Sequence, residues 1–236
     1  MIVYGRNPVH EALRGPRTVA RIWAATDPGW LPDVGPPVAY VESDIIEELC
    51  GSAEHQGVCA EVGTYGYADA DSLLAADDAL VVALDQVQDP HNLGAVCRVA
   101  EAAGAAGVVI PDRRAAEITP AVCKASAGAV EHLRVARVRN LADWLGVAKG
   151  AGAWVYGADA DADTSWSEPD WTGRVVLVLG AEGGGLRPRV AGACDALVAL
   201  PMRGRVGSLN VSTAVAAFLY GIGLLRGRDL ANRPRP

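Results

Sequence analysis

The pattern of hydrophobic and polar positions is clearest from residue 80 onward. There, short continuous apolar runs alternate with longer segments in which apolar residues recur every three or four positions. The runs predict strands at Leu80–Leu84, Val108–Ile110, Leu133–Val138, Trp154–Tyr156, Val175–Leu179 and Leu197–Leu200. The longer segments predict helices at Asn92–Ala103, Thr119–Ala127, Asn140–Ala148 and Ser208–Leu225. Apolar strands that alternate with helices favour an α/β fold, with a parallel sheet covered on both faces.

Before residue 65 the predicted elements are shorter. Strands are predicted at Val19–Ala25, Val38–Val41 and Val58–Val62. Between them, Ser43–Leu49 predicts a helix that the Ser43 side chain caps, with acidic residues in its first turns. Thr64–Asp78 is rich in Gly, Ala and Asp, which predicts a linker with a short helix. We therefore expect a small α/β domain over residues 1–65, a linker over 66–78 and a larger domain over 79–236.

Composition indicates a globular protein. Half of the 236 residues are hydrophobic and 21% are charged, which argues against disorder. The longest apolar run, Val211–Leu225, is shorter than the roughly 20 residues of a membrane span, and no basic segment leads into an apolar one at the N-terminus. The five cysteines and four histidines are scattered without ligand or pairing spacing, so we expect no disulfide framework and no metal. These features together predict a cytoplasmic protein that does not bind a membrane.

The net charge of −7 counts against a protein that holds nucleic acid by bulk electrostatics. The charge is also uneven: residues 1–78 carry −9, whereas residues 79–236 carry +2. Any contact with nucleic acid is therefore expected to depend on local arginines. We expect a stripe of this kind at Arg6, Arg14, Arg113 and Arg114.

Three polar loops follow predicted strands, where functional residues of parallel sheets gather. In the first, Asp89-Pro90 starts a turn and Asn92 stands where a helix cap belongs. Arg98 then falls in a helix of small and apolar residues, where it either pairs with Glu101 three residues on or serves a function.

The second loop runs from Gly180 to Pro188 and has four glycines in six residues, which let the backbone approach a ligand closely. It is neither a P-loop nor a dinucleotide fingerprint, and Glu182 within it is not needed for a bare turn. The third loop, Pro201–Ser212, carries Arg203 and Arg205, a potential cap at Ser208 and an amide at Asn210. This set lacks a His or Cys nucleophile, which suits a reaction governed by positioning.

Taken together, the three loops resemble the signature motifs of the SpoU/TrmH family of RNA ribose 2′-O-methyltransferases. The motifs occupy Asp89–Arg98, Leu179–Leu186 and Leu200–Ser212, in the order and with the spacing of the family. Gly5–Leu13 and His55-Gln56-Gly57 are similar to the small substrate-binding domain of the branch that modifies guanosine in bacterial ribosomal RNA.

The resemblance implies a C-terminal α/β domain with a deep trefoil knot, which binds S-adenosylmethionine and forms a homodimer, and an N-terminal RNA-binding domain like ribosomal protein L30. It implies two sets of site residues. The methyl donor would be bound by Gly180, Glu182, Gly183, Leu200, Met202 and Leu209. Catalysis would depend on Asn92, Arg98, Glu182, Ser208 and Asn210. RNA would meet Arg6, His55 and Gln56, with Arg203 and Arg205 as further phosphate contacts on charge grounds.

The resemblance thus implies methyl transfer from S-adenosylmethionine to the ribose 2′-hydroxyl of a guanosine in large-subunit ribosomal RNA. Arg98 would take the hydroxyl proton or, since a guanidinium keeps its proton and is a poor base, stay cationic and stabilise the forming alkoxide. The same chemistry on tRNA or another ribosomal site is an alternative. A non-catalytic RNA-binding assembly factor is another, and the intact motif residues count against it.

Overall fold

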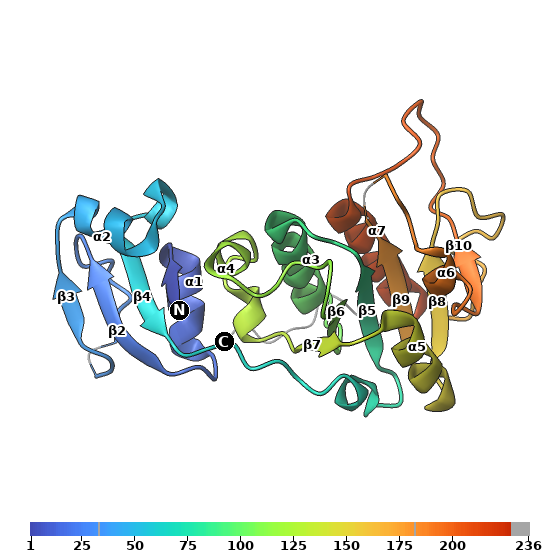
Figure 1. Ribbon diagram of the computed structural model, residues 1–236, viewed down its shortest axis with the longest axis horizontal. Coiled ribbons are helices and arrows are strands. Elements are labelled where there is room, and N and C mark those ends of the chain that lie inside the picture. The colour runs from blue at the N-terminus through green and yellow to red at the C-terminus, as the bar shows by residue number, and fades with distance from the viewer. Residues whose placement is uncertain (33, 182, 228–236) are drawn as a thin grey trace.

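The protein is described from a computed structural model that covers residues 1–32, 34–181 and 183–227 (Figure 1). The strands of this part of the chain form two separate sheets. The smaller, in the order β1-β4-β2-β3, consists of β1 (Ile2–Tyr4), β2 (Val19–Ala24), β3 (Val38–Tyr40) and β4 (Val58–Val62). The larger, in the order β10-β8-β9-β5-β6-β7, consists of β5 (Leu80–Asp85), β6 (Gly107–Pro111), β7 (Val135–Val138), β8 (Trp154–Ala158), β9 (Val175–Gly180) and β10 (Ala196–Val198).

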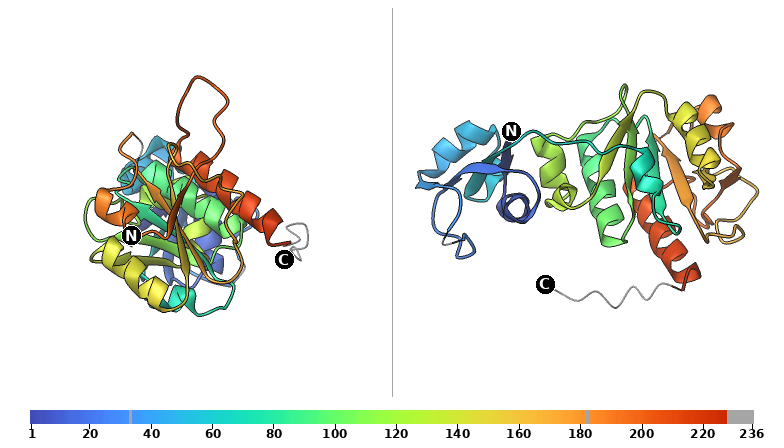
Figure 2. Two further views of the ribbon diagram at one scale, coloured as in Figure 1. Left: turned by 90° about the vertical axis from the view of Figure 1, so that its right-hand side faces the viewer. Right: turned by 90° about the horizontal axis from the view of Figure 1, so that it is seen from below.

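Helices flank both sheets. The α-helices are α1 (Arg6–Arg14), α2 (Ser43–Cys50), α3 (Pro90–Ala102), α4 (Pro120–Ala125), α5 (Leu141–Gly150), α6 (Pro188–Ala191) and α7 (Val211–Leu225). Three short 3₁₀ helices are η1 (Ala53–His55), η2 (Asp71–Leu74) and η3 (Ala129–Glu131). The small sheet with α1 and α2 forms one lobe and the large sheet the other, so the molecule is elongated (Figures 1 and 2).

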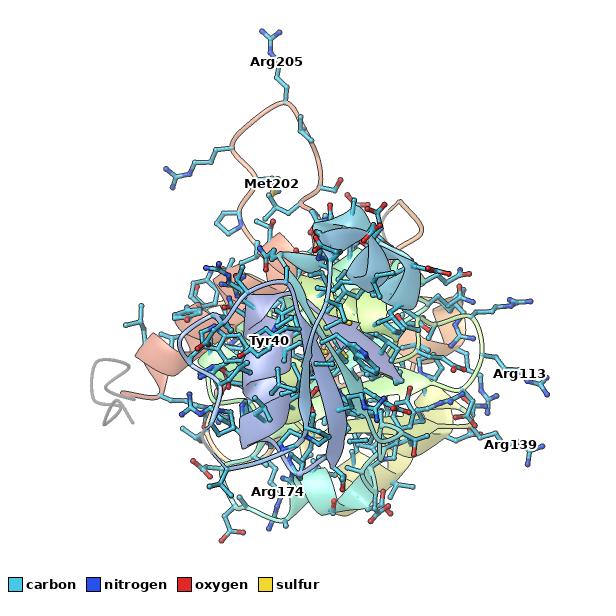
Figure 3. The ribbon with its side chains drawn as sticks, turned by 90° about the vertical axis from the view of Figure 1, so that its left-hand side faces the viewer. Tyr40, Arg113, Arg139, Arg174, Met202 and Arg205 are labelled. Carbon is cyan, nitrogen blue, oxygen red and sulfur yellow. The ribbon has the colours of Figure 1, made fainter. Side chains whose placement is uncertain are left out.

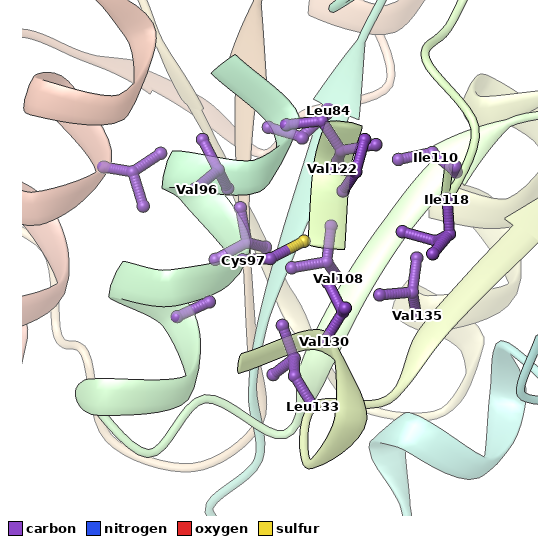
Figure 4. Close-up of a cluster of buried hydrophobic side chains, with 14 of the residues drawn as sticks. Leu84, Val96, Cys97, Val108, Ile110, Ile118, Val122, Val130, Leu133 and Val135 are labelled. Atoms are coloured by element: carbon purple, nitrogen blue, oxygen red, sulfur yellow. The ribbon is translucent and has the colours of Figure 1, made fainter. Parts of the chain in front are cut away.

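The large sheet is parallel throughout, and its strands β5, β6 and β9 are buried on both faces. Alternate residues of β5 enter two cores, because successive side chains of a strand point to opposite faces. Leu84 packs with residues of α3 and α4 in the core that Figure 4 shows, together with Val108 of β6. Ala83 faces the other core, where α5 contributes Leu145. The predicted α/β fold with a doubly covered parallel sheet is confirmed.

Several local predictions need correction. The structure adds β1 and α1, which the hydrophobic pattern did not predict as elements. Helix α3 is capped by Asp89, whose side chain accepts from the His91 amide at 2.9 Å, and Asn92 lies inside its first turn. Helix α2 begins at Ser43, so Ser43 is not its cap. The cap position is Glu42, whose side chain makes no capping hydrogen bond. An aspartate before a proline caps well because proline needs no amide partner at the first helical position.

The segment between the sheets packs on the larger domain. Ala68 forms a parallel bridge to Ala136, beside the end of the large sheet at β7. Leu73 and Leu74 of η2 are buried in the core that α5 covers. The predicted short helix is therefore present, and its two leucines attach the connecting segment to the sheet.

A buried ion pair holds the two domains together. Arg17, just after α1, pairs with Glu131 of η3, and the exposed fractions of the two side chains are only 7% and 1%. The Arg17 guanidinium also donates to the Gly63 carbonyl at 3.3 Å and lies 5.6 Å from the centre of the Tyr65 ring. Because a buried charge requires its partner, this cluster fixes the position of the small domain on the large one.

Among residues 1–32, 34–181 and 183–227, no helix is both long and apolar enough to cross a lipid bilayer. In the same residues no group of three His, Cys, Asp or Glu side chains is arranged to hold a metal ion.

Candidate active site

A cavity of about 560 Å³ opens at the carboxyl ends of three neighbouring strands, β8, β9 and β10. We call it the donor cavity. Its walls come from the loops after these strands and from the start of α7, and they include Asp159, Asp161, Gly180, Leu200, Leu209 and Phe218. Parallel strands bring their carboxyl ends to one edge of a sheet, so loops far apart in the sequence converge there.

Glycine is required at the centre of this cavity. A Cβ atom built on Gly180 would lie 2.0 Å from the Gly185 carbonyl oxygen and 2.6 Å from the Leu186 amide nitrogen. Gly183 and Gly185 have φ values of +73° and +59°, a region that side chains other than glycine rarely adopt. The loop therefore folds tightly back on the end of β9, and its described glycines present backbone atoms to the cavity.

A buried carboxylate anchors the far end of this loop. Asp85, at the end of β5, is fully buried, and its Oδ2 accepts from the Arg187 backbone amide at 2.9 Å. Its Oδ1 accepts from Arg187 Nε at 2.8 Å and lies 2.6 Å from the adjacent guanidinium nitrogen. Charged, bidentate hydrogen bonds of this kind are strong and directional. The motif analysis did not single out Asp85, although an acid that ends an otherwise apolar strand was a usable signal.

Two of the predicted catalytic asparagines lie side by side at the rim. Asn210 Nδ2 donates to Asn92 Oδ1 at 2.9 Å, which joins the first turn of α3 to the start of α7. Asn210 also caps α7, since its Oδ1 accepts from the Ser212 amide at 2.9 Å. The prediction that Ser208 caps this helix is wrong: α7 begins at Val211, and Ser208 is an exposed residue of the cavity wall.

The structure places Arg98 elsewhere. It is exposed on α3 and lines a second cavity, whose lining also includes Arg14 of the small domain. Six helical residues from Asn92 to Arg98 correspond to a rise of about 9 Å and a turn to another face of the helix. Within one chain, Arg98 is therefore separated from the asparagine pair with which it was grouped. Of the two alternatives for Arg98, the ion pair with Glu101 does not occur among the ion pairs of the described residues.

The described residues that were predicted to bind the methyl donor all line the donor cavity: Gly180, Gly183, Leu200, Met202 and Leu209. Met202 and Leu209 are 36% and 39% exposed, which is unusual for such apolar side chains. Glu182, predicted for both catalysis and donor binding, lies outside the described residues. The sequence motifs thus identified the cavity wall, and the loop after β8, with Asp159 and Asp161, is the part that they did not indicate.

The residues predicted to meet RNA lie in two places. Arg205 is at the tip of the loop before α7, which projects from the body, and Arg203 precedes it in the same loop (Figure 3). Arg6 and Gln56 are exposed on the small domain, where Gln56 Oε1 accepts from the Arg6 amide at 3.0 Å. His55 is only 5% exposed, and its Nδ1 accepts from the Gly57 amide at 3.0 Å, so here its ring holds a turn.

The cysteines are unsuited to nucleophilic chemistry. Burial raises the pKa of the Cys97 thiol to about 12, and burial likewise raises that of Cys194, near the donor cavity, to about 11. Both thiols are therefore neutral near pH 7, and only a thiolate is an effective nucleophile. The chemistry open to the donor cavity is binding and alignment of reactants by backbone amides, amide side chains and carboxylates.

Family models match both domains. Residues 79–220 match the SpoU rRNA Methylase family, and residues 2–68 match the family described as RNA 2'-O ribose methyltransferase substrate binding. Fold, glycine-lined cavity and substrate-binding domain together define an RNA methyltransferase. The chain belongs to the SpoU/TrmH family, as the three motifs indicated.

Similar proteins agree with this assignment. A protein of Bacillus subtilis assigned to the TrmH family of tRNA/rRNA methyltransferases is 40% identical, over 93% of this chain and 94% of the relative. A tRNA/rRNA methyltransferase of a Mycobacterium species is 42% identical, over 94% of this chain and 75% of the relative.

Two similar solved structures contain bound AdoMet. The SpoU methyltransferase AviRb of Streptomyces viridochromogenes, in complex with the cofactor AdoMet, superposes with a TM-score of 0.80. It is 27% identical and covers 99% of this chain and 91% of its own. An AdoMet-bound rRNA methyltransferase of Sinorhizobium meliloti has a TM-score of 0.79 at 25% identity, over 94% and 86% of the two chains.

Proposed function

We propose that this protein transfers a methyl group from S-adenosylmethionine to the ribose 2′-hydroxyl of a guanosine in large-subunit ribosomal RNA. Two observations carry the proposal: the glycine-lined donor cavity, and the hydrogen bond from Asn210 to Asn92, since Asn210 stands between two residues of the cavity wall, Leu209 and Val211. Both occur in a chain whose residues 2–68 match a substrate-binding domain of RNA 2'-O ribose methyltransferases. The guanosine branch is favoured by the Gly5–Leu13 and His55–Gly57 segments.

The donor cavity fits S-adenosylmethionine in size and chemistry. A volume of about 560 Å³ falls in the range of small-molecule sites, roughly 300–1,000 Å³. Leu200, Leu209 and Phe218 supply apolar surface, whereas Asp159 and Asp161 supply carboxylates that complement the positive charges of the donor. When bound, the donor supplies an electrophilic methyl group.

The protein residues then have to position the ribose and stabilise charge. Asn92 and Asn210 offer amide groups to ribose oxygens at the rim of the donor cavity, and Ser208 shapes the wall beside them. Arg98 faces the developing negative charge on the 2′-oxygen as a cation, because a guanidinium keeps its proton and is therefore a poor base. Substitution of Arg98 by Lys separates the two roles: a near-normal rate would exclude any mechanism that requires a guanidinium.

We propose further that the active unit is a homodimer. The last turns of α7 expose Tyr220, Leu224 and Leu225, with exposed fractions of 42%, 72% and 52%, a surface suited to a second copy. A second copy also offers a way to bring an Arg98 to a donor cavity, which one chain does not do. The same proposal includes a trefoil knot in the large domain, an L30-like small domain, domain limits at residues 65 and 79, and a cytoplasmic location.

The dimer has a direct test. Arg98→Ala and Gly180→Val variants, each inactive alone, are mixed under conditions that exchange subunits. Activity in the mixture is expected, because a mixed dimer holds one intact donor cavity and one intact Arg98. Sedimentation as a monomer at all concentrations, or no recovered activity in verified mixed dimers, would contradict the arrangement.

The function itself is tested with radiolabelled S-adenosylmethionine and three substrates in parallel: protein-free large-subunit RNA, assembled subunits and bulk tRNA. The wild-type protein is expected to label large-subunit RNA. Arg98→Ala should abolish this label, and Arg139→Ala should retain it. A methyl group on the 2′-oxygen blocks alkaline cleavage of the adjacent phosphodiester, so an alkali-resistant labelled dinucleotide with guanosine at its 5′ side confirms ribose and base. Label on tRNA would show that tRNA is the substrate in place of ribosomal RNA. Binding of S-adenosylmethionine without any methyl transfer would favour a non-catalytic assembly factor.

A further inference from the structure

A second cavity, of about 530 Å³, opens between the two domains. We call it the seam cavity. Its polar lining comes from α1 of the small domain and from α3 and the end of η3 in the large domain: Asn7, Glu11, Arg14, Arg98, Glu101 and His132. Its volume is close to that of the donor cavity, and its lining joins Arg98 of the first motif to residues of α1.

The floor of the seam cavity is made of small residues, Ala102, Ser126, Ala127 and Ala129. Ala127 has a φ of +52°, a left-handed conformation that is unfavourable for a residue with a Cβ atom. This conformation reverses the chain between α4 and η3. Such strained positions concentrate at functional sites, because the surrounding structure has to maintain them. The opening is thus built into the backbone.

The charges around the seam cavity leave the arginines available. Glu11 is engaged by its neighbours: its Oε2 lies 2.7 Å from His132 Nε2 and its Oε1 lies 3.2 Å from His10 Nδ1. Arg14 is held only loosely, with its closest guanidinium nitrogen 3.8 Å from Glu11 Oε1, and nearly half of its side chain is exposed. Arg98 takes part in no ion pair among the described residues, although Glu101 lines the same cavity one turn along α3.

We propose that the seam cavity is an RNA subsite in which Arg14 and Arg98 bind the same phosphodiester, next to the ribose whose 2′-oxygen Arg98 faces. The inference rests on the proposed function, since it takes RNA as the ligand. A guanidinium binds phosphate oxygens with two parallel hydrogen bonds, so two of them on one phosphate give a contact with defined geometry. The RNA strand would then span both domains, and α1 would help to set which ribose reaches the active site.

The test uses a labelled single-stranded oligoribonucleotide as probe and fluorescence anisotropy as readout. Arg14→Gln, Arg98→Gln and the double variant are compared with Arg139→Gln, which removes an exposed arginine outside the seam cavity (Figure 3). Each single variant is expected to bind about tenfold more weakly, since hydrogen bonds to a charged group contribute about 1.5–3 kcal/mol. The slope of log affinity against log salt is expected to fall by about 0.7, one phosphate contact on a single strand.

The double variant decides whether the phosphate is shared. If both arginines hold one phosphate, losing the second after the first costs little, so the double variant is expected to bind almost as well as the weaker single variant. Losses that multiply would place the two arginines on different phosphates and overturn the proposal. Wild-type affinity in Arg14→Gln would overturn it as well.

Two further experiments test the site. The first distinguishes the shape of the cavity from its charge, and the second distinguishes an RNA strand from a free anion as the ligand. Ala102→Trp fills the exposed floor of the seam cavity without changing charge, and weaker RNA binding is expected; unchanged binding would contradict the site. Excess inorganic phosphate is expected to act only through ionic strength. Specific competition by phosphate would assign the cavity to a free anion instead of RNA.

Failure of this inference can be distinguished from failure of the proposed function, because methyl transfer is measured separately. If the wild-type protein binds the probe with the expected coupling but methylates no RNA, the function is wrong and the subsite stands. If large-subunit RNA is methylated and Arg14→Gln binds normally, the function stands and the subsite is wrong.

Discussion

The donor cavity and the seam cavity have nearly the same volume, about 560 and 530 Å³, but different construction. The donor cavity lies within one domain, and backbone and apolar side chains form much of its wall. The seam cavity lies between domains, and charged side chains from separate helices form its wall. A loop that must bend tightly around a ligand needs glycine at fixed positions, which leaves a motif. No single stretch of sequence shows that charged residues from two domains meet in one cavity. The comparison predicts that the two cavities can be disabled separately.

The largest effect is expected from Glu131, which supports the seam cavity. Glu131→Gln leaves the buried Arg17 charge without a counter-ion, and the free energy of unfolding is expected to fall by about 3–5 kcal/mol. At a temperature where the variant stays folded, RNA affinity is expected to drop while S-adenosylmethionine affinity is retained. Thermal unfolding and calorimetric titration measure the two effects, with the exposed Glu48→Gln as control. Equal loss of both affinities would show that the cavities are not independent.

The converse variant is Gly180→Val. Its Cβ atom would overlap the Gly185 carbonyl, so the glycine-rich loop has to move. We expect donor affinity and methyl transfer to fall at least about 100-fold, because even small displacements of positioning groups have such effects. RNA binding through the seam cavity is expected to stay intact. Gly146→Ala is the matched control, since nothing lies within 4 Å of that Cβ position.

A smaller effect is expected at the anchor of the loop. Asp85→Asn removes the charge that holds Arg187, and the free energy of unfolding is expected to fall by about 2 kcal/mol, below the full buried-pair value since Arg187 is 42% exposed. The KM for S-adenosylmethionine is expected to rise more than kcat falls. Asp143→Asn breaks a pair whose side chains are 62% and 70% exposed, and this change should cost less than about 0.5 kcal/mol. Similar losses in both variants would argue against the anchor.

The smallest effect concerns acid pH at the seam. Burial acts to raise the pKa of Glu11, but hydrogen bonds from His132 and His10 and the charge of Arg14 outweigh it, so the pKa is lowered from its ordinary value of 4.5. The stabilisation is therefore present above pH 4.5 and lost as pH falls through the lowered pKa. The difference in Tm between wild type and Glu11→Gln should be small near neutral pH and vanish in acid. A difference that grows in acid would contradict this assignment.

Much of the fold followed from local pattern. The strands of the large sheet were predictable because continuous apolar runs are typical of strands buried on both faces, and their alternation with helices implied parallel pairing. Helix α1 was less visible because its nine residues include glutamate and two arginines beside few apolar ones. The caps were harder to place, since Asp89 and Asn92 both suit a cap and the choice depends on where the proline begins the helix.

The sequence by itself determined the family, the glycine-lined cavity and most of its described wall, because these depend on short motifs, each contained in one local segment of the chain. Only the tertiary structure decided that Asp85 anchors Arg187, that Asn92 meets Asn210, and that Arg98 and Arg14 line one cavity. These pairs join residues that are far apart in the chain, and their approach depends on sheet order and on how the two domains pack. The local sequence pattern shows where the backbone needs glycine, a strand or a helix. Which distant side chains come into contact is decided only in the folded molecule.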